Sequence, residues 1–140
     1  MRETDGYGKR SGGILKELRE EGAPTETYTK YLGEGTLAFQ RCTSCERVVF
    51  YPRVLCPYCG STSLEWRESS GRGAVYAATA VYHRDREPHN VALVDLDDGF
   101  RMMSRVEAIA AEEVEIGMRV CFQAREEEGG PVAVFLPEER

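Results

Sequence analysis

Apolar and polar residues alternate with a period of two along much of the second half of the chain, and this pattern predicts β-strands. Residues 118–125 are the clearest case, because apolar side chains at the even positions alternate with Arg119, Cys121, Gln123 and Arg125. A strand of this kind buries one face and exposes the other. Four further strands are predicted in the same way, at residues 73–82, 91–96, 100–106 and 132–136. Five strands with no long helix between them indicate a small closed or nearly closed barrel such as an OB-fold.

The beginning of the chain follows a helical pattern instead. Residues 14–21 place apolar side chains at helical spacing, which predicts a helix of two turns. A second helical turn carries Tyr28, Tyr31 and Leu32 on one face before Gly33. Isolated helices this short are marginal in water, so we expect them to cover a partner's surface rather than the chain's own ribbon.

Two cysteine pairs stand between these regions. Cys42-Thr-Ser-Cys45 and Cys56-Pro-Tyr-Cys59 are separated by ten residues. Each pair offers two sulfurs to one tetrahedral ion, so the four together form a closed structural metal site. We expect zinc as the cofactor, with iron as the alternative because a rubredoxin-like site uses the same ligands.

Short β-rich segments flank the pairs at residues 37–41, 48–51 and 64–67, which completes the pattern of a rubredoxin-like zinc ribbon. Gly60 after the second pair permits the left-handed backbone that turns amide groups toward the sulfurs, whereas Glu46 stands in the equivalent place after the first. The metal supplies stability that a core of about thirty residues could not.

We therefore predict a mainly β chain in three parts. Residues 1–35 form the N-terminus and a helical arm, residues 36–68 the zinc ribbon and residues 69–140 a five-stranded OB-fold barrel.

Charge and composition narrow the function. Among the 140 residues, 24 acids outnumber 18 bases, giving a net charge of −6, and this disfavours nucleic acid as a partner. Arg41, Arg47 and Arg53 bracket the cysteines, and we interpret them as compensating the charge of the site. Five cysteines cannot all pair within one chain, and neither a secretion signal nor a long apolar run is present, so we expect a cytoplasmic protein without a membrane segment.

No catalytic residue is predicted. Cys121 has no histidine base beside it in the sequence, and His83 and His89 lie in a polar loop where solvation is expected. Arg84 and Arg86 in the same loop are candidates for contacts with the phosphates of coenzyme A, although alternating charge is also typical of an exposed loop.

Two aromatic residues leave an alternative open. Tyr76 and Tyr82 share strand parity, so we expect them to pack against the helical arm or inside the barrel. The surface of an OB-fold could instead stack bases on them, which would make the chain a single-stranded nucleic-acid-binding module. A third hypothesis is an electron carrier with iron at the four sulfurs.

The order Tyr31-Leu-x-Glu-Gly35-x-Leu37-x-Phe39-Gln-Arg-Cys42-x-x-Cys45, followed by Pro52-Arg53-x-x-Cys56-Pro-x-Cys59-Gly60-Ser, resembles the zinc-ribbon/OB-fold accessory proteins associated with acyl-CoA metabolism. The barrel segments Gly71-x-Gly73-x-Val75-Tyr and Ile116-Gly-Met118-x-Val120 extend the likeness, which covers residues 28–137.

This resemblance implies a non-catalytic subunit of an acyl-CoA enzyme. Members of the family partner thiolases or thiolase-like acyltransferases, and related domains accompany MaoC-type hydratases and lipid-transfer-protein-like aldolases. The ribbon and the N-terminal helices dock on the partner in such assemblies, which makes Tyr28, Tyr31 and Leu32 candidate docking residues. The barrel helps to shape the acyl-CoA site.

Overall fold

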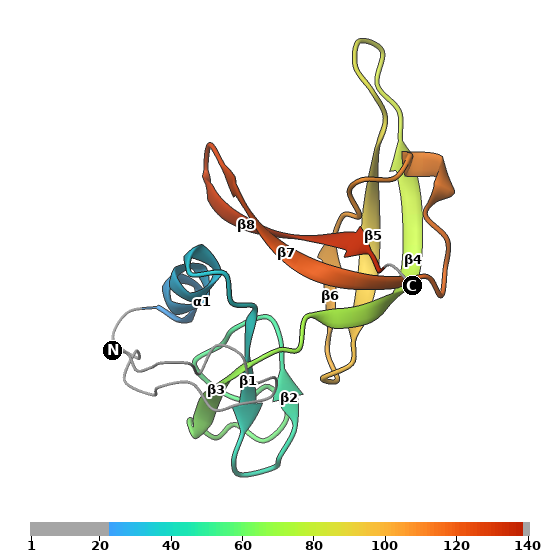
Figure 1. Ribbon diagram of the computed structural model, residues 1–140. Coiled ribbons are helices and arrows are strands. Elements are labelled where there is room, and N and C mark those ends of the chain that lie inside the picture. Colours follow the sequence, from blue (N-terminus) through green and yellow to red (C-terminus); the bar gives the residue numbers. More distant parts are fainter. Residues whose placement is uncertain (1–22, 139–140) are drawn as a thin grey trace.

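The computed structural model describes residues 23–138, in which a small three-stranded ribbon lies beneath a five-stranded barrel (Figure 1). The helix predicted at residues 14–21 lies outside the described residues. The elements in chain order are α1 (Pro24–Gly33), β1 (Ala38–Cys42), β2 (Val48–Val49), β3 (Leu64–Glu68), β4 (Arg72–Val81), β5 (His89–Leu96), β6 (Arg101–Ser104), the 3-10 turn η3 (Ala111–Glu113), β7 (Arg119–Glu127) and β8 (Gly130–Pro137).

The ribbon is an antiparallel sheet with β1 in the centre, in the order β2-β1-β3. The segment predicted as a strand at residues 48–51 pairs only over Val48–Val49. Phe50 leaves the sheet and stacks on Phe100 of the barrel, with ring centroids 4.6 Å apart. After Val49 the chain thus leaves the ribbon sheet and contacts the barrel.

The barrel is built from one antiparallel sheet in the order β6-β5-β4-β7-β8. Its two edge strands meet where Phe135 of β8 bridges the segment that follows β6 in a parallel arrangement. The Phe135 N–H donates to the Arg105 carbonyl at 3.0 Å, and the Glu107 N–H donates to the Phe135 carbonyl at 2.8 Å. These bonds close the barrel, so the predicted mainly β architecture with an OB-fold is confirmed.

Ribbon and barrel share one hydrophobic core. Leu37 and Phe39 enter from the ribbon side and pack with barrel residues such as Val94, Phe100 and Phe135, all of them buried. The ring centroids of Phe39 and Phe100 are 5.0 Å apart. A common core fixes the ribbon against the barrel because separating them would expose these side chains to water.

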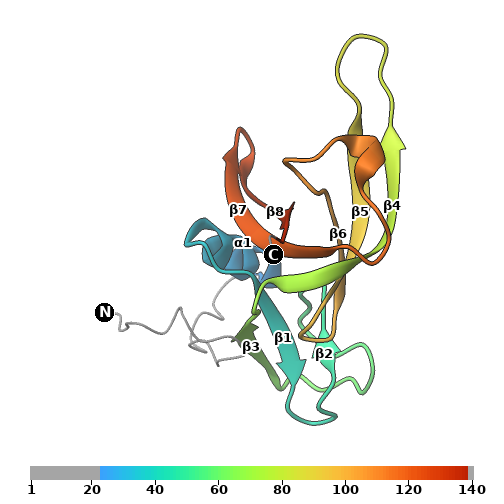
Figure 2. The ribbon, with the colours of Figure 1, turned by 45° about the vertical axis from the view of Figure 1, so that its right-hand side comes forward.

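The helix α1 begins with a proline, which is favoured in the first helical turn, and ends at Gly33. Leu32 is only 3% exposed, and the ring of Tyr28 meets Phe50 edge-on at 5.6 Å. Figure 2 shows α1 beside the β7–β8 hairpin, with which it is in contact. The helix α1 therefore lies on its own chain, against the ribbon and the β7–β8 hairpin, which is the surface that the sequence analysis disfavoured. Docking of the same helix on a partner stays a prediction.

The expected packing of Tyr76 and Tyr82 is also wrong, because 49% and 65% of their respective surfaces are exposed. A β-bulge between Val75 and Ala77 in the pairing of β4 with β5 disturbs the alternation at Tyr76. The guanidinium of Arg101 lies 3.5 Å from the centroid of the Tyr76 ring. Tyr82 lies beyond the end of β4.

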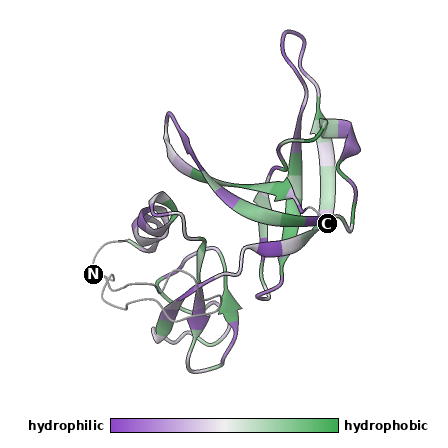
Figure 3. Cartoon of the chain, viewed as in Figure 1, coloured by the Kyte–Doolittle hydropathy of each residue, from purple (hydrophilic) through white to green (hydrophobic). Residues whose placement is uncertain are grey.

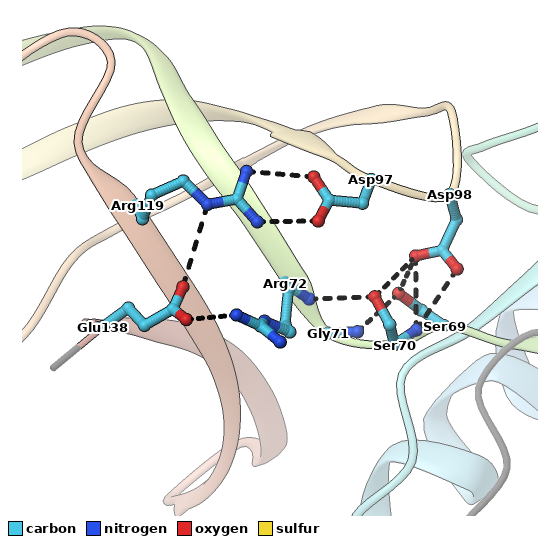
Figure 4. A network of polar contacts seen from close by, with 8 residues as sticks. All are labelled: Ser69, Ser70, Gly71, Arg72, Asp97, Asp98, Arg119 and Glu138. Atoms are coloured by element: carbon cyan, nitrogen blue, oxygen red, sulfur yellow. Dashed lines mark hydrogen bonds and ion pairs between the residues drawn. The ribbon is translucent and has the colours of Figure 1, made fainter. Parts of the chain in front are cut away.

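The connection between ribbon and barrel is held by a polar network (Figure 4). Asp98, in the β5–β6 turn, accepts hydrogen bonds from the Ser69 hydroxyl at 2.5 Å and from the Ser70 N–H at 3.2 Å. Arg119 donates twice to Asp97, at 2.7 and 3.1 Å. The β5–β6 turn thus binds both the segment that joins ribbon to barrel, at Ser69 and Ser70, and the start of β7, at Arg119.

Candidate metal centre

The four predicted cysteine ligands come together at one end of the ribbon. Their Sγ atoms all lie within 4.8 Å of one another. Cys42 and Cys59 are 3.6 Å apart between sulfurs, and Cys45 and Cys56 are 3.7 Å apart. A tetrahedron with Zn–S bonds of about 2.3 Å has an edge of about 3.8 Å, so this arrangement fits a tetrahedral ion. Within residues 23–138 no other group of three or more metal-binding side chains is found.

Each cysteine pair forms a tight turn, called a knuckle here, and the two knuckles have the same backbone geometry. The Cys42 carbonyl accepts from the Glu46 N–H at 2.8 Å, and the Cys56 carbonyl accepts from the Gly60 N–H at 2.9 Å. Glu46 and Gly60 both have left-handed backbones, with φ of 69° and 82°. The first knuckle therefore adopts the turn without the glycine that normally permits it.

Backbone amides point at the sulfurs, as expected for ligands that carry negative charge. The Cys45 N–H lies 3.4 Å from Cys42 Sγ and is the main reason that the pKa of Cys42 falls to about 6. A hydrogen bond from the Ser61 amide lowers the pKa of Cys59, but desolvation and contacts with the other three sulfurs outweigh it and raise that pKa to about 11. Zinc binds thiolates, so binding of an ion at the quartet would release protons from the cysteines.

Buried residues of the three ribbon strands support the site. Cys42 and Cys56 are buried against Val49, with Leu64 packed beside them. Gln40 is 3% exposed and hydrogen-bonds the backbone of Arg53, three residues before the second pair. Sequence reasoning missed Gln40, because its partner is a backbone group thirteen residues away and leaves no pattern.

The hairpin between β4 and β5 carries the other polar residues that the sequence singled out. His83 Nε2 and His89 Nδ1 are 2.8 Å apart, and the Arg86 guanidinium lies 3.4 Å from His83 Nδ1. Desolvation lowers the pKa of His83, and Arg86 and His89 lower it further. The structure thus brings the two histidines and Arg86 together. Arg84 forms no ion pair with a carboxylate among the residues that the structure describes.

The remaining candidates lie apart from the sulfurs. Cys121 is half-buried in β7, where it pairs with Leu136 of β8. Tyr31 is half-buried against Trp66, with ring centroids 5.9 Å apart. Tyr28 is half-buried, and burial raises its pKa to about 12. Their part in docking stays a prediction.

An exposed apolar segment that leads into and includes the second cysteine pair was not singled out from the sequence. Val54, Leu55 and Tyr58 are 66%, 50% and 57% exposed. The available signal was charge: residues 54–64 contain no charged side chain in a chain that is 30% charged. No helix among the described residues has the length and apolar character needed to cross a membrane.

Two family models match the chain in succession. The first, described as the ChsH2 rubredoxin-like zinc ribbon domain, matches residues 29–65. The second, described as the ChsH2 C-terminal OB-fold domain, matches residues 66–125.

Curated relatives include a bacterial and two archaeal proteins. The chain is 36% identical over 88 residues to a probable enoyl-CoA hydratase alpha subunit of Thermomonospora curvata, a match that covers 60% of this chain but only 28% of that protein. It is 32% identical over 97 residues to a DUF35 domain-containing scaffold protein of Methanocaldococcus jannaschii, covering 64% of this chain and 69% of that one. A scaffold protein of the same description from Methanothermobacter thermautotrophicus is 30% identical, with 66% of this chain and 76% of that protein covered.

Two solved structures have a similar fold. A chain of the structure titled "Ltp2-ChsH2(DUF35) aldolase" superposes with a TM-score of 0.75 and 29% identity, covering 84% of this chain and 97% of that one. A DUF35 protein of unknown function from Sulfolobus solfataricus gives a TM-score of 0.66 over 86% of this chain and 90% of that one, and at 17% identity it supports the fold alone. The chain therefore belongs to the DUF35 family, in which a rubredoxin-like zinc ribbon precedes a C-terminal OB-fold domain.

Proposed function

We propose that this protein is a non-catalytic accessory subunit of a cytoplasmic acyl-CoA-processing enzyme, with a thiolase or thiolase-like acyltransferase as its partner. The observation that carries the proposal is the likeness to 97% of one chain of the structure titled "Ltp2-ChsH2(DUF35) aldolase". The scaffold proteins and the enoyl-CoA hydratase subunit among the relatives support it.

The composition of the site supports a structural role for the metal. Four sulfurs complete a tetrahedral coordination and leave no position for substrate or water, which catalytic zinc requires. We propose zinc as the resident ion. A colourless protein with one zinc per chain by elemental analysis would agree with this, whereas stoichiometric iron with visible thiolate-to-iron absorption would favour the electron carrier.

Arg84 and Arg86 are the residues that we propose for coenzyme A. They lie at the tip of the β4–β5 hairpin, which extends away from the ribbon in both views (Figures 1 and 2). Guanidinium groups bind phosphate oxygens through paired hydrogen bonds. A tip that reaches across to a partner's active site would let the barrel contribute to the acyl-CoA site without catalysing the reaction.

Of the three docking residues predicted on α1, we propose that two contact the partner directly and that the third supports the helix. Tyr28 and Tyr31 are half-buried, so each retains some surface for a partner. Leu32 is buried in the chain's own core, so it contributes by holding the helix in place.

Co-expression tests the proposal. The full chain would be expressed with each tagged thiolase-family or lipid-transfer-protein-like subunit encoded in its source genome, and the pairs separated by size-exclusion chromatography with light scattering. We expect one of them to elute with this chain as a stoichiometric complex. A chain that elutes alone from every pair would refute the proposed function.

The nucleic-acid alternative has less support. Arg101 already covers one face of Tyr76, and stacking platforms need accessible faces. Fluorescence anisotropy with a labelled single-stranded oligonucleotide at low salt tests this alternative. Binding would support a nucleic-acid-binding module, and no binding would exclude it.

A further inference from the structure

Two histidines face each other at the tip of the β4–β5 hairpin, outside the sulfur site. His83 follows the end of β4, and His89 is the first residue of β5, where it pairs with Val81. His83 Nε2 and His89 Nδ1 are 2.8 Å apart, and the planes of the two rings are inclined by only 20°. The sequence contains no other histidine. Both imidazoles of the chain thus present a ring nitrogen to the same place.

The contacts of the pair imply where its protons lie. A guanidinium group can only donate, so the contact of Arg86 with His83 Nδ1 at 3.4 Å makes that nitrogen an acceptor. The proton of neutral His83 therefore lies on Nε2 and is donated to His89 Nδ1. The lone pair of His89 Nδ1 already faces its neighbour, and one change of tautomer in His83 would provide a second lone pair beside it.

The distance between the two nitrogens matches a particular coordination geometry. Bonds from a metal to imidazole nitrogen are about 2.0–2.1 Å long, so two of them at 90° place their nitrogens about 2.9 Å apart, whereas a tetrahedral angle places them about 3.3 Å apart. The observed separation of 2.8 Å is close to the first value. Square-planar and tetragonal sites with nitrogen ligands are typical of Cu(II) and Ni(II).

The surroundings of the pair leave room for an ion. His89 is exposed and His83 is half-buried. Within the described part of the chain, no third histidine, cysteine or carboxylate side chain joins them, so water would complete the coordination. The tip is hydrophilic (Figure 3). Its charged side chains cancel and do not repel a cation as a group, since they are Arg84, Asp85, Arg86 and Glu87.

We propose that His83 and His89 form a second metal site, which binds a divalent transition-metal ion of tetragonal preference, Ni(II) or Cu(II), through His83 Nε2 and His89 Nδ1. The ion replaces the hydrogen bond between the rings, and the proton of His83 moves from Nε2 to Nδ1. Arg86 cannot donate to a protonated Nδ1, so binding of the ion separates Arg86 from His83. The site depends neither on the sulfur quartet nor on the proposed function.

Nickel chloride is the probe that tests this site. The untagged full chain, loaded with zinc at the four sulfurs, would be titrated by isothermal titration calorimetry, while NMR follows the ring protons of the two histidines. We expect one Ni(II) per chain beyond the zinc, with the signals of both histidines changing together. Mn(II), the weakest of the series at nitrogen ligands, should bind at least about a hundredfold more weakly. Equal binding of the two ions would indicate carboxylate ligands and overturn the site.

Substitution of each histidine tests whether both are ligands. We expect His83→Ala and His89→Ala each to weaken nickel binding by about a hundredfold, the upper end of what loss of a group that merely supports a ligand costs. Zinc content and thermal midpoint, measured on each variant, show that the sulfur site and the fold are intact. A folded variant of either kind that binds nickel like the wild type would overturn the paired site.

Two arginine variants test the position of the proton. Arg86→Ala and Arg84→Ala each remove one positive charge from the hairpin, but only Arg86 is in contact with His83. We expect nickel binding to strengthen by about tenfold in Arg86→Ala and by about twofold in Arg84→Ala, because only Arg86 competes for His83 Nδ1. Equal effects would overturn the proposed exchange of Arg86 for the proton.

The wild-type titration is decisive for the site as a whole. A zinc-loaded chain that binds no nickel would show that the two rings form a hydrogen bond only, and it would overturn the second metal site.

Discussion

The side-chain amide of Gln40 forms two hydrogen bonds with the backbone of Arg53. Gln40 Oε1 accepts from the Arg53 N–H at 2.7 Å, and Nε2 donates to the Arg53 carbonyl at 2.9 Å. The pair joins the central strand of the ribbon to the segment that leads into Cys56. The same double contact occurs in the barrel, where Asn90 binds the N–H and the carbonyl of Val106 at 2.8 Å each. A side-chain amide thus fixes an irregular segment in each half of the molecule.

Replacing Gln40 by leucine should lower the free energy of unfolding by about 1–3 kcal/mol, because the Arg53 backbone groups lose their partners in a part-buried place. Denaturant unfolding of the zinc-loaded protein measures this. Gln123→Leu, on an exposed position of β7, should change stability by less than about 0.5 kcal/mol. Equal effects of the two substitutions would show that the Gln40 contact contributes nothing.

Replacing Glu46 by glycine should stabilise the ribbon. Its φ of 69° is a conformation that costs a non-glycine residue about 1 kcal/mol, and its ion pair with Arg41 is exposed and long at 3.9 Å. We expect slower transfer of zinc to a competing chelator, followed by absorbance. Gly60→Ala, at the equivalent place of the second knuckle, should accelerate that transfer. Faster transfer in Glu46→Gly would contradict the assignment of strain.

Removing the Asp98 carboxylate should loosen the connection between ribbon and barrel. Asp98→Ala leaves the Ser70 N–H and the Ser69 hydroxyl without their acceptor, at a cost of about 1–2 kcal/mol. Hydrogen exchange should accelerate at residues 69–72 while the strands of the barrel stay protected. Asp85→Ala in the exposed β4–β5 hairpin is the control, and identical exchange in both variants would refute the role of Asp98.

His83 should titrate below the ordinary value of 6.5, because desolvation and the nearby Arg86 and His89 lower its pKa. Since the folded state then binds the proton less readily than the unfolded state, the contribution of His83 to stability falls as pH drops from 6.5 through the folded pKa. NMR titration of the ring protons measures the pKa directly. Arg86→Ala should raise it toward 6.5, and Arg84→Ala should leave it nearly unchanged; the reverse order would contradict the geometry.

The metal should depend on four cysteines and not on the fifth. Cys56→Ser should abolish stoichiometric zinc and unfold the ribbon, since structural zinc supplies folding free energy on the order of 10 kcal/mol. Cys121→Ser, in β7, should keep one zinc per chain. Elemental analysis with circular dichroism reads out both, and zinc loss in Cys121→Ser would be incompatible with the assigned ligands.

Local patterns predicted the parts of the fold that depend on neighbours in sequence. Period-two alternation predicted β7 and β8, and the spacing of the cysteines predicted four sulfurs that converge within 4.8 Å. Both signals lie within a short window of the chain, which is why a single sequence contains them.

Features that depend on long-range packing were not predictable. The stacking of Phe50 on Phe100 and the grip of Asp98 on Ser69 join residues far apart in the chain, and no local periodicity encodes them. The bulge beside Tyr76 reverses an inference from strand parity, because one extra residue changes the alternation. The left-handed Glu46 shows that the fold of the knuckle overrides the backbone preference of a residue.

We propose that this chain enables an acyl-CoA enzyme without catalysing its reaction, and turnover of the reconstituted complex tests this most directly. The enzyme subunit would be assayed with its acyl-CoA substrate alone, with the zinc-loaded chain, and with Cys56→Ser. We expect high turnover only in the complex with the zinc-loaded chain, and none from the chain alone. A subunit that is fully active by itself, or a chain that turns over substrate unaided, would contradict the account.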